Sequence, residues 1–220
     1  MVIPVHDGAR FLAEALRSVD DQDVDVEVVV VDDGSTDASA QIAVDLGANC
    51  IRQANQGPAA ARNAGIAATT APLLSFLDVD DLIPPGALAR QLDHLAANPD
   101  ADGVMGGQEY RVLDGVALPD WAVADDVGGP GEVARPHVFA SVIRRSTFDR
   151  IGGFDPRFRL SEDVDWLMRA NEAGVVIDVV PEVARIRRIH GANLTYDTEA
   201  LRRSTFTVLG ERARRKRSAS

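Results

Sequence analysis

Lysine and cysteine each occur once in this sequence of 220 residues, as Lys216 and Cys50. A P-loop needs a lysine directly after its glycine and a pyridoxal-dependent enzyme needs one for its Schiff base, so the sequence excludes both classes. A single cysteine rules out an internal disulfide and favours a reducing compartment. No run approaches the roughly 20 apolar residues of a membrane-spanning helix, and no signal-peptide pattern follows Met1. These absences predict a cytoplasmic protein.

Composition and charge describe an ordinary globular domain, with 45% hydrophobic and 26% charged residues. The length predicts one domain over residues 1–210, followed by a tail at 211–220. The net charge of −11 argues against nucleic-acid binding, because most of the surface would repel a phosphate backbone. The tail differs, since it concentrates the basic residues Arg212, Arg214, Arg215, Lys216 and Arg217. It is either a solvated chain end or a peripheral contact with an anionic membrane face.

Strand and helix patterns alternate over residues 2–97. Apolar runs predict strands at 2–5, 26–31, 49–52 and 73–77, and apolar residues at helical spacing predict helices at 9–21, 38–46, 58–68 and 85–97. The alternation predicts an α/β fold: a single Rossmann-like domain with a mostly parallel central sheet flanked by helices. Ligands of such sheets bind beyond the carboxyl ends of the strands.

After Asp102 strand and helix patterns no longer alternate regularly. The predicted elements are strands at 104–112, 139–143, 175–180 and 183–189 and helices at 146–151 and 162–173. Ser161 is the expected N-cap of the second helix. A loop at 114–136 contains Trp121, and loops of this length are usually functional or mobile.

The segment 73–81, LLSFLDVDD, is the strongest candidate for chemistry. Five mostly apolar residues predict a buried parallel strand, and three carboxylates follow at its end. If the extended geometry persists, Asp78 and Asp80 point the same way. Paired carboxylates at a strand's carboxyl end suit a hard divalent cation, which commonly shares its ligands with substrate phosphates. The alternative is that these acids only solvate a loop and cap the next helix.

Two further polar sites are predicted at the same edge of the sheet. Asp32 and Asp33 form either an Asx turn or a site that accepts hydrogen bonds from a base N–H or a sugar hydroxyl. Arg62 follows a predicted helix start at Pro58, where free backbone N–H groups favour anions. It approaches a diphosphate there, or it is a surface arginine that covers alanines.

The second half offers one acidic pair and one histidine. Glu162 and Asp163 lie in the first turn of a predicted helix, where acids are common in any case. Side chains at adjacent helical positions project about 100° apart, so one can act as a base while the other orients it. His190 ends a predicted strand and is either an ordinary packed histidine or a ligand of metal or phosphate. The four histidines follow no zinc spacing, and no Ser-His-Asp order is present.

Seven segments together resemble family 2 glycosyltransferases, nucleotide-diphospho-sugar transferases of the A-type fold, and the resemblance covers almost the whole chain. The segments are VIPVHDGARFL, VVVVDDGSTD, NQGPAAARNAGI, LLSFLDVDD, IGGFD, SEDVDWLMRA and RRIHGANLT. Each is weak alone, but their order and separation are specific. The resemblance implies inverting transfer of a sugar, commonly from a UDP-sugar, to a carbohydrate, lipid-linked or other hydroxyl acceptor. It also implies a nucleotide-binding half at 1–100 and an acceptor and catalytic half at 101–210.

Residue roles follow from the same resemblance. Asp163 matches the catalytic base, with Glu162 beside it on the acceptor side. Asp80 would bind Mg²⁺ or Mn²⁺ that bridges the diphosphate, with Asp78 and His190 as further metal ligands. The residues expected to contact the nucleotide are Pro4, Val5, His6, Asp33, Arg62, Asp78 and Val79.

Two alternatives stay open. A nucleotidyltransferase shares this kind of sheet and acidic metal ligands, but it usually has a glycine-rich basic stretch near the first strand, where this chain offers only Arg10. A sugar-nucleotide-binding or assembly protein without catalysis is the second alternative. The joint presence of Asp80 and Asp163 argues against it.

Overall fold

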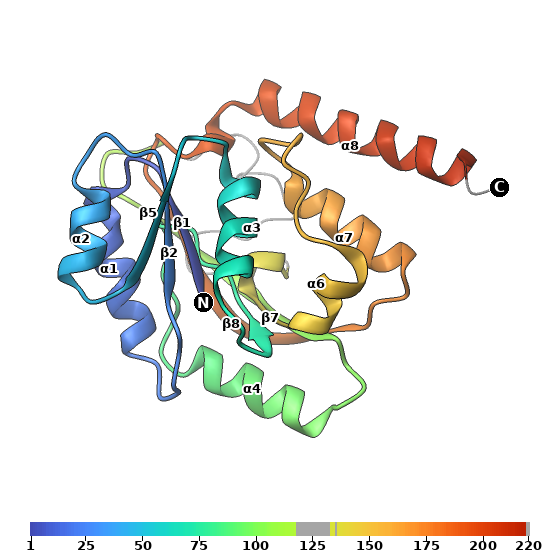
Figure 1. The fold of residues 1–220 in the computed structure, drawn as a ribbon, viewed down its shortest axis with the longest axis horizontal. Coiled ribbons are helices and arrows are strands. Elements are labelled where there is room, and N and C mark those ends of the chain that lie inside the picture. Colours follow the sequence, from blue (N-terminus) through green and yellow to red (C-terminus); the bar gives the residue numbers. More distant parts are fainter. Residues whose placement is uncertain (118–132, 135, 219–220) are drawn as a thin grey trace.

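The computed structural model describes residues 1–117, 133–134 and 136–218. Its first sheet contains three parallel strands in the order β1 (Val2–Val5), β2 (Val29–Asp33) and β3 (Asn49–Gln53). Helices α1 (Ala9–Asp20), α2 (Ser39–Asp45) and α3 (Pro58–Ala68) follow these strands in turn. In Figure 1, α1 and α2 lie on one side of the strands and α3 lies on the other. The α/β class predicted from the sequence is confirmed, and these helices end within one residue of their predicted bounds.

Strand β2 shows why a run of valines forms the centre of this layer. Alternate side chains of a strand point to opposite faces, so Val30 packs with α1 whereas Val29 and Val31 pack on the α3 side. All three are fully buried. A strand buried on both faces reads as a continuous apolar run, which is the pattern that predicted it.

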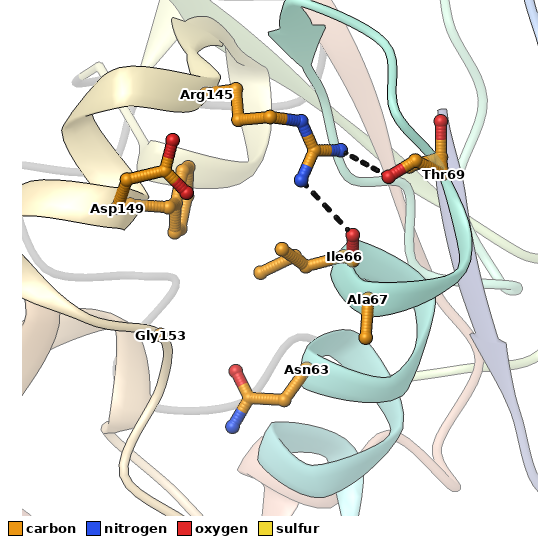
Figure 2. Close-up of a pocket in the computed structure, with 8 residues that line it drawn as sticks. Asn63, Ile66, Ala67, Thr69, Arg145, Asp149 and Gly153 are labelled. Carbon is orange, nitrogen blue, oxygen red and sulfur yellow. Dashed lines mark hydrogen bonds between the residues drawn. The ribbon is translucent and has the colours of Figure 1, made fainter.

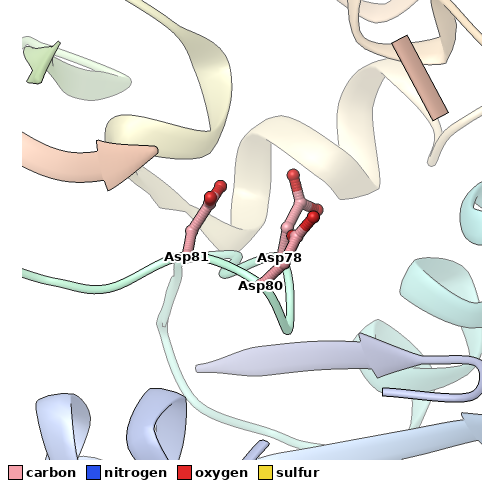
Figure 3. Close-up of side chains that lie close together, drawn as sticks. All are labelled: Asp78, Asp80 and Asp81. Carbon is pink, nitrogen blue, oxygen red and sulfur yellow. The ribbon is translucent and has the colours of Figure 1, made fainter. Parts of the chain in front are cut away.

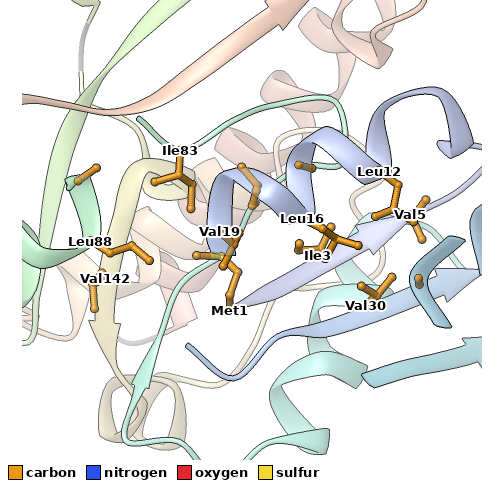
Figure 4. Close-up of a cluster of buried hydrophobic side chains, with 14 of the residues drawn as sticks. Met1, Ile3, Val5, Leu12, Leu16, Val19, Val30, Ile83, Leu88 and Val142 are labelled. Carbon is orange, nitrogen blue, oxygen red and sulfur yellow. The ribbon is translucent and has the colours of Figure 1, made fainter. Parts of the chain in front are cut away.

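Helix α1 buries a stripe at helical spacing, formed by Leu12, Ala15, Leu16 and Val19. Figure 4 shows Leu12, Leu16 and Val19 directed at residues of β1 and β2. Fully burying one leucine side chain contributes about 1.5–3 kcal/mol. This packing fixes the position of α1 above the sheet, and therefore of the loop that precedes it.

The second sheet is mixed, which the sequence did not predict. It contains β4 (Leu73–Leu74), β5 (Gly103–Val112), β6 (Val133–Ala134), β7 (Ser141–Arg144) and β8 (Ile177–Ile189). Strand β5 pairs in parallel with β8 and antiparallel with β6 and β7, and β4 pairs antiparallel with β7. The parallel arrangement therefore holds for the first sheet and for one pair of the second.

The predicted strand at 73–77 divides between the two sheets. Leu73 and Leu74 pair with β7, whereas the next residues turn to β1, where Val2 N donates to Ser75 O at 2.9 Å and Leu77 N donates to Val2 O at 3.1 Å. Phe76 forms an isolated parallel bridge with Val2. The segment thus joins the two sheets and carries the acids that follow it to their common edge.

The two strands predicted at 175–180 and 183–189 are one strand, β8, because Pro181 is accommodated at an irregularity rather than a turn. The register with β5 shifts on both sides of Gly107. At Gly106 an added Cβ would lie 2.8 Å from Glu182 O, so glycine permits the close approach of the two strands there. Bulges of this kind accommodate a proline within a sheet.

The remaining helices cover the second sheet and the upper edge of the molecule in Figure 1. They are α4 (Ala87–Ala97), α6 (Arg145–Ile151), α7 (Glu162–Glu172) and α8 (Thr198–Ser218), with short 3-10 turns at Val138–Ala140 (η1) and Leu194–Tyr196 (η2). No helix in the described ranges is long and apolar enough to cross a membrane. Trp121 and most of the loop predicted at 114–136 lie outside the described residues.

The basic segment at 211–218 continues helix α8 rather than forming an irregular tail. Arg212 Nε lies 2.9 Å from Glu172 Oε1, and Arg215 Nη1 lies 3.0 Å from Asp165 Oδ1, a buried carboxylate of α7. These basic side chains hold α8 against α7. Fewer of them are therefore available to an anionic surface than the sequence alone suggests.

Candidate active site

Two loops at the carboxyl ends of β1 and β2 bind each other through side-chain caps. Asp7 Oδ1 accepts a hydrogen bond from Thr36 N at 2.7 Å, and Asp37 Oδ2 accepts one from Ala9 N at 2.9 Å. Gly8 N donates to Ser39 Oγ at 3.0 Å. These paired loops, residues 6–9 and 34–39, fix the starts of α1 and α2 relative to each other.

Asp33 is buried at the end of β2 and receives three protein donors. Its Oδ1 accepts from Gln53 Nε2 at 2.8 Å and from Gln56 N at 2.9 Å, and its Oδ2 accepts from Gly57 N at 2.8 Å. The carboxylate therefore shapes the entry to α3, in addition to any role toward a base. His6, beside it, is half exposed and its Nδ1 lies 2.9 Å from Asp33 O.

The neighbouring Asp32 accepts a backbone hydrogen bond from three residues further on, rather than from two residues on as in the Asx turn that the sequence offered as one alternative. Its Oδ1 accepts from Ser35 N at 2.9 Å, and its Oδ2 lies 2.7 Å from Arg52 Nε. This fully buried carboxylate is turned away from the loop edge and into the protein.

The acids after Leu77 lie in a turn, so the extended geometry expected there does not persist. Asp81 N donates to Asp78 O at 2.9 Å, which closes a β-turn. Figure 3 shows the carboxylates of Asp78 and Asp80 side by side, with Asp81 directed apart from them. One oxygen or more from each of the three lies within 4.8 Å of the others. The predicted common direction of Asp78 and Asp80 is therefore observed, but the turn produces it.

Two buried arginines connect this turn to the second half of the chain. Arg62, which is 3% exposed, binds Asp78 Oδ1 through Nη2 and Glu162 Oε1 through Nη1, the latter at 2.5 Å. Arg185 binds Asp78 Oδ2 through Nη2 at 2.5 Å and Asp81 Oδ2 through Nε at 2.6 Å. We refer to Arg62, Asp78, Asp81, Glu162 and Arg185 as the charge network.

Arg62 is therefore not the surface arginine that the sequence left open. Its guanidinium carbon lies 3.8 Å from the centroid of the Phe139 ring, and its Nε has no hydrogen-bond partner among the described residues. A cation stacked on an aromatic face gains from the ring quadrupole, most of all when it is desolvated. Arg62 thus occupies the centre of the site.

The charge network pushes the pKa values of its carboxyl groups apart. Burial raises the pKa of Glu162 to about 7, with Arg62 acting against this and the charge of Asp163 adding to it. Burial acts on Asp78 in the same sense, but Arg62 and Arg185 outweigh it and hold the pKa of Asp78 well below its usual range. Burial also raises the pKa of Asp81, which Arg185 opposes. Groups with such perturbed values cluster at functional sites.

Asp80 is the carboxylate best placed to hold a metal. Its Oδ2 accepts from His190 Nε2 at 3.0 Å and from Asn193 Nδ2 at 2.9 Å, and its Oδ1 has no partner among the described residues. Oxygen donors beside Asp78 on a partly exposed edge fit Mg²⁺ or Mn²⁺. In this arrangement His190 orients Asp80 through Nε2, as the outer-shell partner of a metal ligand does.

Asp163 lies beside Glu162 and is paired with a histidine that the sequence did not single out. His137 Nε2 is 3.2 Å from Asp163 Oδ2, and both side chains are largely buried. Burial raises the pKa of Asp163, but the hydrogen bond and charge of His137 and a backbone bond from Val164 outweigh it, so the pKa falls below its usual value. The surroundings of Asp163 therefore favour the ionised form of its carboxyl group.

The structure brings most of the predicted residues to one edge. Glu162, Asp78 and Arg62 are in direct contact, Asp163 follows Glu162 along α7, and Asp80 adjoins Asp78 in the turn. Val79 packs toward Gly8, where an added Cβ would meet it at 2.9 Å, so the turn touches the paired loops. Pro4 and Val5 lie at the end of β1 and pair with β2.

Sequence reasoning missed Arg185 and His137. Arg185 is a nearly buried charge within a strand, which usually implies a buried partner; the pattern in 183–189 therefore contained a signal. His137 follows the segment predicted as a loop, and nothing in its sequence neighbours indicates its partner. Only the meeting of η1, α7 and β8 reveals it.

A pocket of about 350 Å³ between α3 and α6 contains none of these residues (Figure 2). Arg145 points into it and donates to the carbonyl oxygens of Ile66 at 3.2 Å, Thr69 at 2.8 Å and Ala71 at 2.7 Å. Arg145 therefore satisfies backbone acceptors at the end of α3. The pocket has a structural explanation and lies apart from the acids.

Residues 1–152 match the family Glycosyl transferase family 2. The chain is 32% identical to the succinoglycan biosynthesis protein ExoU of Rhizobium meliloti (strain 1021), over 95% of this chain and 68% of that protein.

Solved structures show the same fold at low sequence identity. S. aureus TarS 1–349 in complex with UDP-GlcNAc superposes with a TM-score of 0.68 at 19% identity, over 94% of this chain and 64% of that one. The mannosyltransferase PcManGT from Pyrobaculum calidifontis, in complex with GDP-Man and Mn²⁺, gives a TM-score of 0.72 at 20% identity, over 97% of this chain and 63% of that one. The chain thus spans less than two thirds of both solved chains.

Proposed function

Because this chain belongs to glycosyl transferase family 2, we propose that it transfers a sugar from a nucleotide diphosphate donor to an acceptor hydroxyl with inversion at the anomeric carbon. The observation that carries the proposal is the continuity of the site. Arg62 pairs with Asp78, beside Asp80, and with Glu162. Asp163 is connected to Asp78 through His137 and Arg185. A metal-binding edge and an ionised base thus lie within one connected group of side chains.

In the proposed reaction Asp163 accepts the proton of the acceptor hydroxyl. The acceptor oxygen then forms a bond to the anomeric carbon, and the bond from that carbon to the diphosphate oxygen breaks with its electron pair leaving on the diphosphate. A positioned general base contributes about 10²- to 10⁴-fold to such a step. Asp163 Oδ2 faces His137, so Oδ1 is the oxygen that receives the proton.

The donor is proposed to lie over the carboxyl ends of the first strands. The residues assigned to nucleotide binding are Pro4, Val5, His6, Asp33, Arg62, Asp78 and Val79. Asp80 and Asp78 would hold Mg²⁺ or Mn²⁺, which when bound stabilises the charge that develops on the diphosphate. His190, expected from the sequence as a third ligand, instead orients Asp80 through Nε2. The PcManGT complex supports this choice, since it contains Mn²⁺ with a sugar nucleotide.

Donor identity is tested by thermal stabilisation, because a ligand that prefers the native state raises its melting temperature. The panel is UDP-GlcNAc, UDP-Glc, UDP-Gal and GDP-Man, each with and without Mn²⁺. We expect a UDP-sugar to give the largest shift, and to give it only with metal. Asp80→Ala should abolish the metal-dependent part of the shift. A shift that is unchanged in Asp80→Ala would contradict the metal assignment.

The base is tested separately. Asp163→Asn keeps the shape of the side chain but removes its basicity, so donor binding should stay nearly intact while kcat falls about 10²-fold or more. Calorimetry with the donor and a transfer assay measure the two effects. Turnover at the level of the natural protein would refute the assignment. Donor binding without transfer to any acceptor in the natural protein would favour the sugar-nucleotide-binding alternative.

Peripheral membrane contact through the basic end of α8 is a further part of the proposal. The supporting observation is that Arg214 and Arg217 are exposed on the helix. Deletion of residues 211–220 should lower sedimentation with anionic liposomes. Because that deletion also removes the pairs with Glu172 and Asp165, the double substitution Arg214→Gln and Arg217→Gln is the sharper variant.

A further inference from the structure

His137 has two hydrogen-bond donors directed at one of its ring nitrogens. Phe139 N donates to Nδ1 at 3.2 Å, and Arg185 Nη1 approaches the same nitrogen at 3.2 Å. A backbone N–H and a guanidinium can only donate, so Nδ1 must accept and carries no proton. The ring proton of the neutral histidine is therefore on Nε2.

That proton is directed at the proposed base. Nε2 lies 3.2 Å from Asp163 Oδ2, and the ring reaches no other carboxylate among the described residues. Burial lowers the pKa of His137, although Asp163 opposes this, so the ring stays neutral. A neutral Nε2–H donor fixes one oxygen of Asp163, whose carboxylate also accepts a backbone hydrogen bond from Val164.

Arg185 connects this pair to the opposite side of the site. The guanidinium that donates to His137 also binds Asp78 and Asp81. The tautomer of His137, and with it the direction of its donor, is therefore fixed by a group anchored at the turn that carries the metal-binding acids.

We propose that His137 is a positioning residue for sugar transfer: its Nε2–H orients Asp163, and Arg185 sets the tautomer that makes this possible. The inference rests on the proposed role of Asp163 as the base. His137 does not exchange the proton with the acceptor. It acts through Asp163, as the hydrogen-bonded partner of a reactive group does.

The charged groups facing the pair decide how its loss affects pH dependence. Three groups face Asp163: His137 of the segment before η1, Arg62 of α3 and Glu162 of its own helix. His137 faces Asp163, together with Arg185 and Arg187 of β8. Loss of the Nε2–H removes a donor to the ionised form of Asp163, so its pKa rises. The acid limb of kcat/KM then moves to higher pH.

Two substitutions of His137 test the roles of Nε2 and Nδ1 separately. His137→Gln places an amide N–H near the position of Nε2, whereas His137→Asn places an amide oxygen near Nδ1 but has no donor that reaches Asp163. We expect His137→Asn to lower kcat about 10-fold or more, a fraction of the 10²- to 10⁴-fold that a general base contributes. Its KM for the donor should stay within about threefold, and its acid limb should shift upward. His137→Gln should restore most of kcat and the original acid limb.

The matched control is a second, partly buried His–Asp pair, His94 and Asp178, at 2.8 Å between α4 and β8. His94→Asn breaks a His–Asp hydrogen bond outside the site and should leave the pH profile unchanged. An acid limb in His137→Asn that coincides with that of the natural protein would overturn the inference and leave His137 as a packing residue.

A measurement without substrate makes the two proposals separable. In ¹⁵N NMR of the histidine ring, His137 should show an unprotonated Nδ1 and a protonated Nε2 at neutral pH. A protonated Nδ1 would overturn the inference even if Asp163→Asn abolishes transfer. If Asp163→Asn retains full turnover, the proposed base fails, whatever tautomer is found.

Discussion

The paired loops and the charge network differ in the kind of donor that binds their polar side chains. Both hold polar groups at the edge of the sheets, but in the paired loops the acids and serines bind backbone N–H groups, as Asp7, Asp37 and Ser39 do. In the charge network, carboxylates bind guanidinium groups, and three of these pairs join residues that are 100 or more positions apart along the chain: Arg62 with Glu162, and Arg185 with Asp78 and Asp81. Backbone donors exist in every sequence, whereas a particular distant arginine does not.

The two regions also differ in the stability that is lost when one partner of an interaction is removed. A net hydrogen bond to a backbone N–H contributes about 0.5–1.5 kcal/mol, or about 1.5–3 when the partner is charged. Removing one partner of a buried ion pair leaves an uncompensated charge and typically costs about 3–5 kcal/mol. The charge network is therefore the more fragile region, although it contains the groups assigned to chemistry.

The largest expected effect tests that fragility. Arg185→Met leaves Asp81, which is 1% exposed, without its guanidinium partner. We expect a loss of about 3–5 kcal/mol in the free energy of unfolding near neutral pH, measured by urea denaturation. Arg203→Met is the control, because its pair with Glu199 is 74% exposed on both sides and such pairs contribute about 0–1 kcal/mol. Equal losses in the two variants would contradict the comparison.

The next effect concerns shape rather than charge in the first half of the chain. An added Cβ at Gly65 of α3 would lie 2.3 Å from Val2 Cγ1 of β1. Gly65→Ala should therefore push α3 off the sheet and destabilise the protein by about 1–3 kcal/mol. At Gly210 of α8 no atom lies within 4 Å of an added Cβ, so Gly210→Ala should instead stabilise by about 0.5–1 kcal/mol. Thermal melting of both variants would show opposite shifts, and a neutral Gly65→Ala would be inconsistent with this packing.

The smallest effect depends on pH. Burial raises the folded-state pKa of Glu162 to about 7 from an ordinary value of 4.5, so the stability that its protonated form contributes is present below pH 4.5 and is lost as the pH rises toward 7. Glu162→Gln cannot titrate. Between about pH 5 and about pH 8 the natural protein should lose on the order of 1 kcal/mol relative to the variant, and parallel stability curves would argue against this pKa.

Much of the first half could be predicted from the sequence, because local rules govern it. A valine run, helical spacing and a proline at the first turn of α3 predict β2, α1 and α3, and these rules depend on neighbours along the chain. The carboxylates of Asp33, Asp78 and Asp80 could be placed at one sheet edge because parallel strands end at a common edge.

Other features required partners that the sequence does not identify. Residues 73–77 form one mostly apolar run in the sequence. In the structure the first part pairs with β7 and the second part with β1, because each part lies beside a different strand. The sequence left Arg62 open as a surface side chain, because no residue close to it along the chain indicates a partner of opposite charge. Its partners are Asp78 and Glu162.

The sequence by itself determined the class of fold, the order of its first elements and the residue types that collect at the strand ends. Only the tertiary structure decided that Arg62 and Arg185 bridge those acids and that His137 faces Asp163. The physical reason is the separation along the chain over which each effect acts. Backbone geometry and apolar periodicity act between residues that are close along the chain, whereas buried charges are stabilised by whichever opposite charges the folded chain brings within a few ångströms.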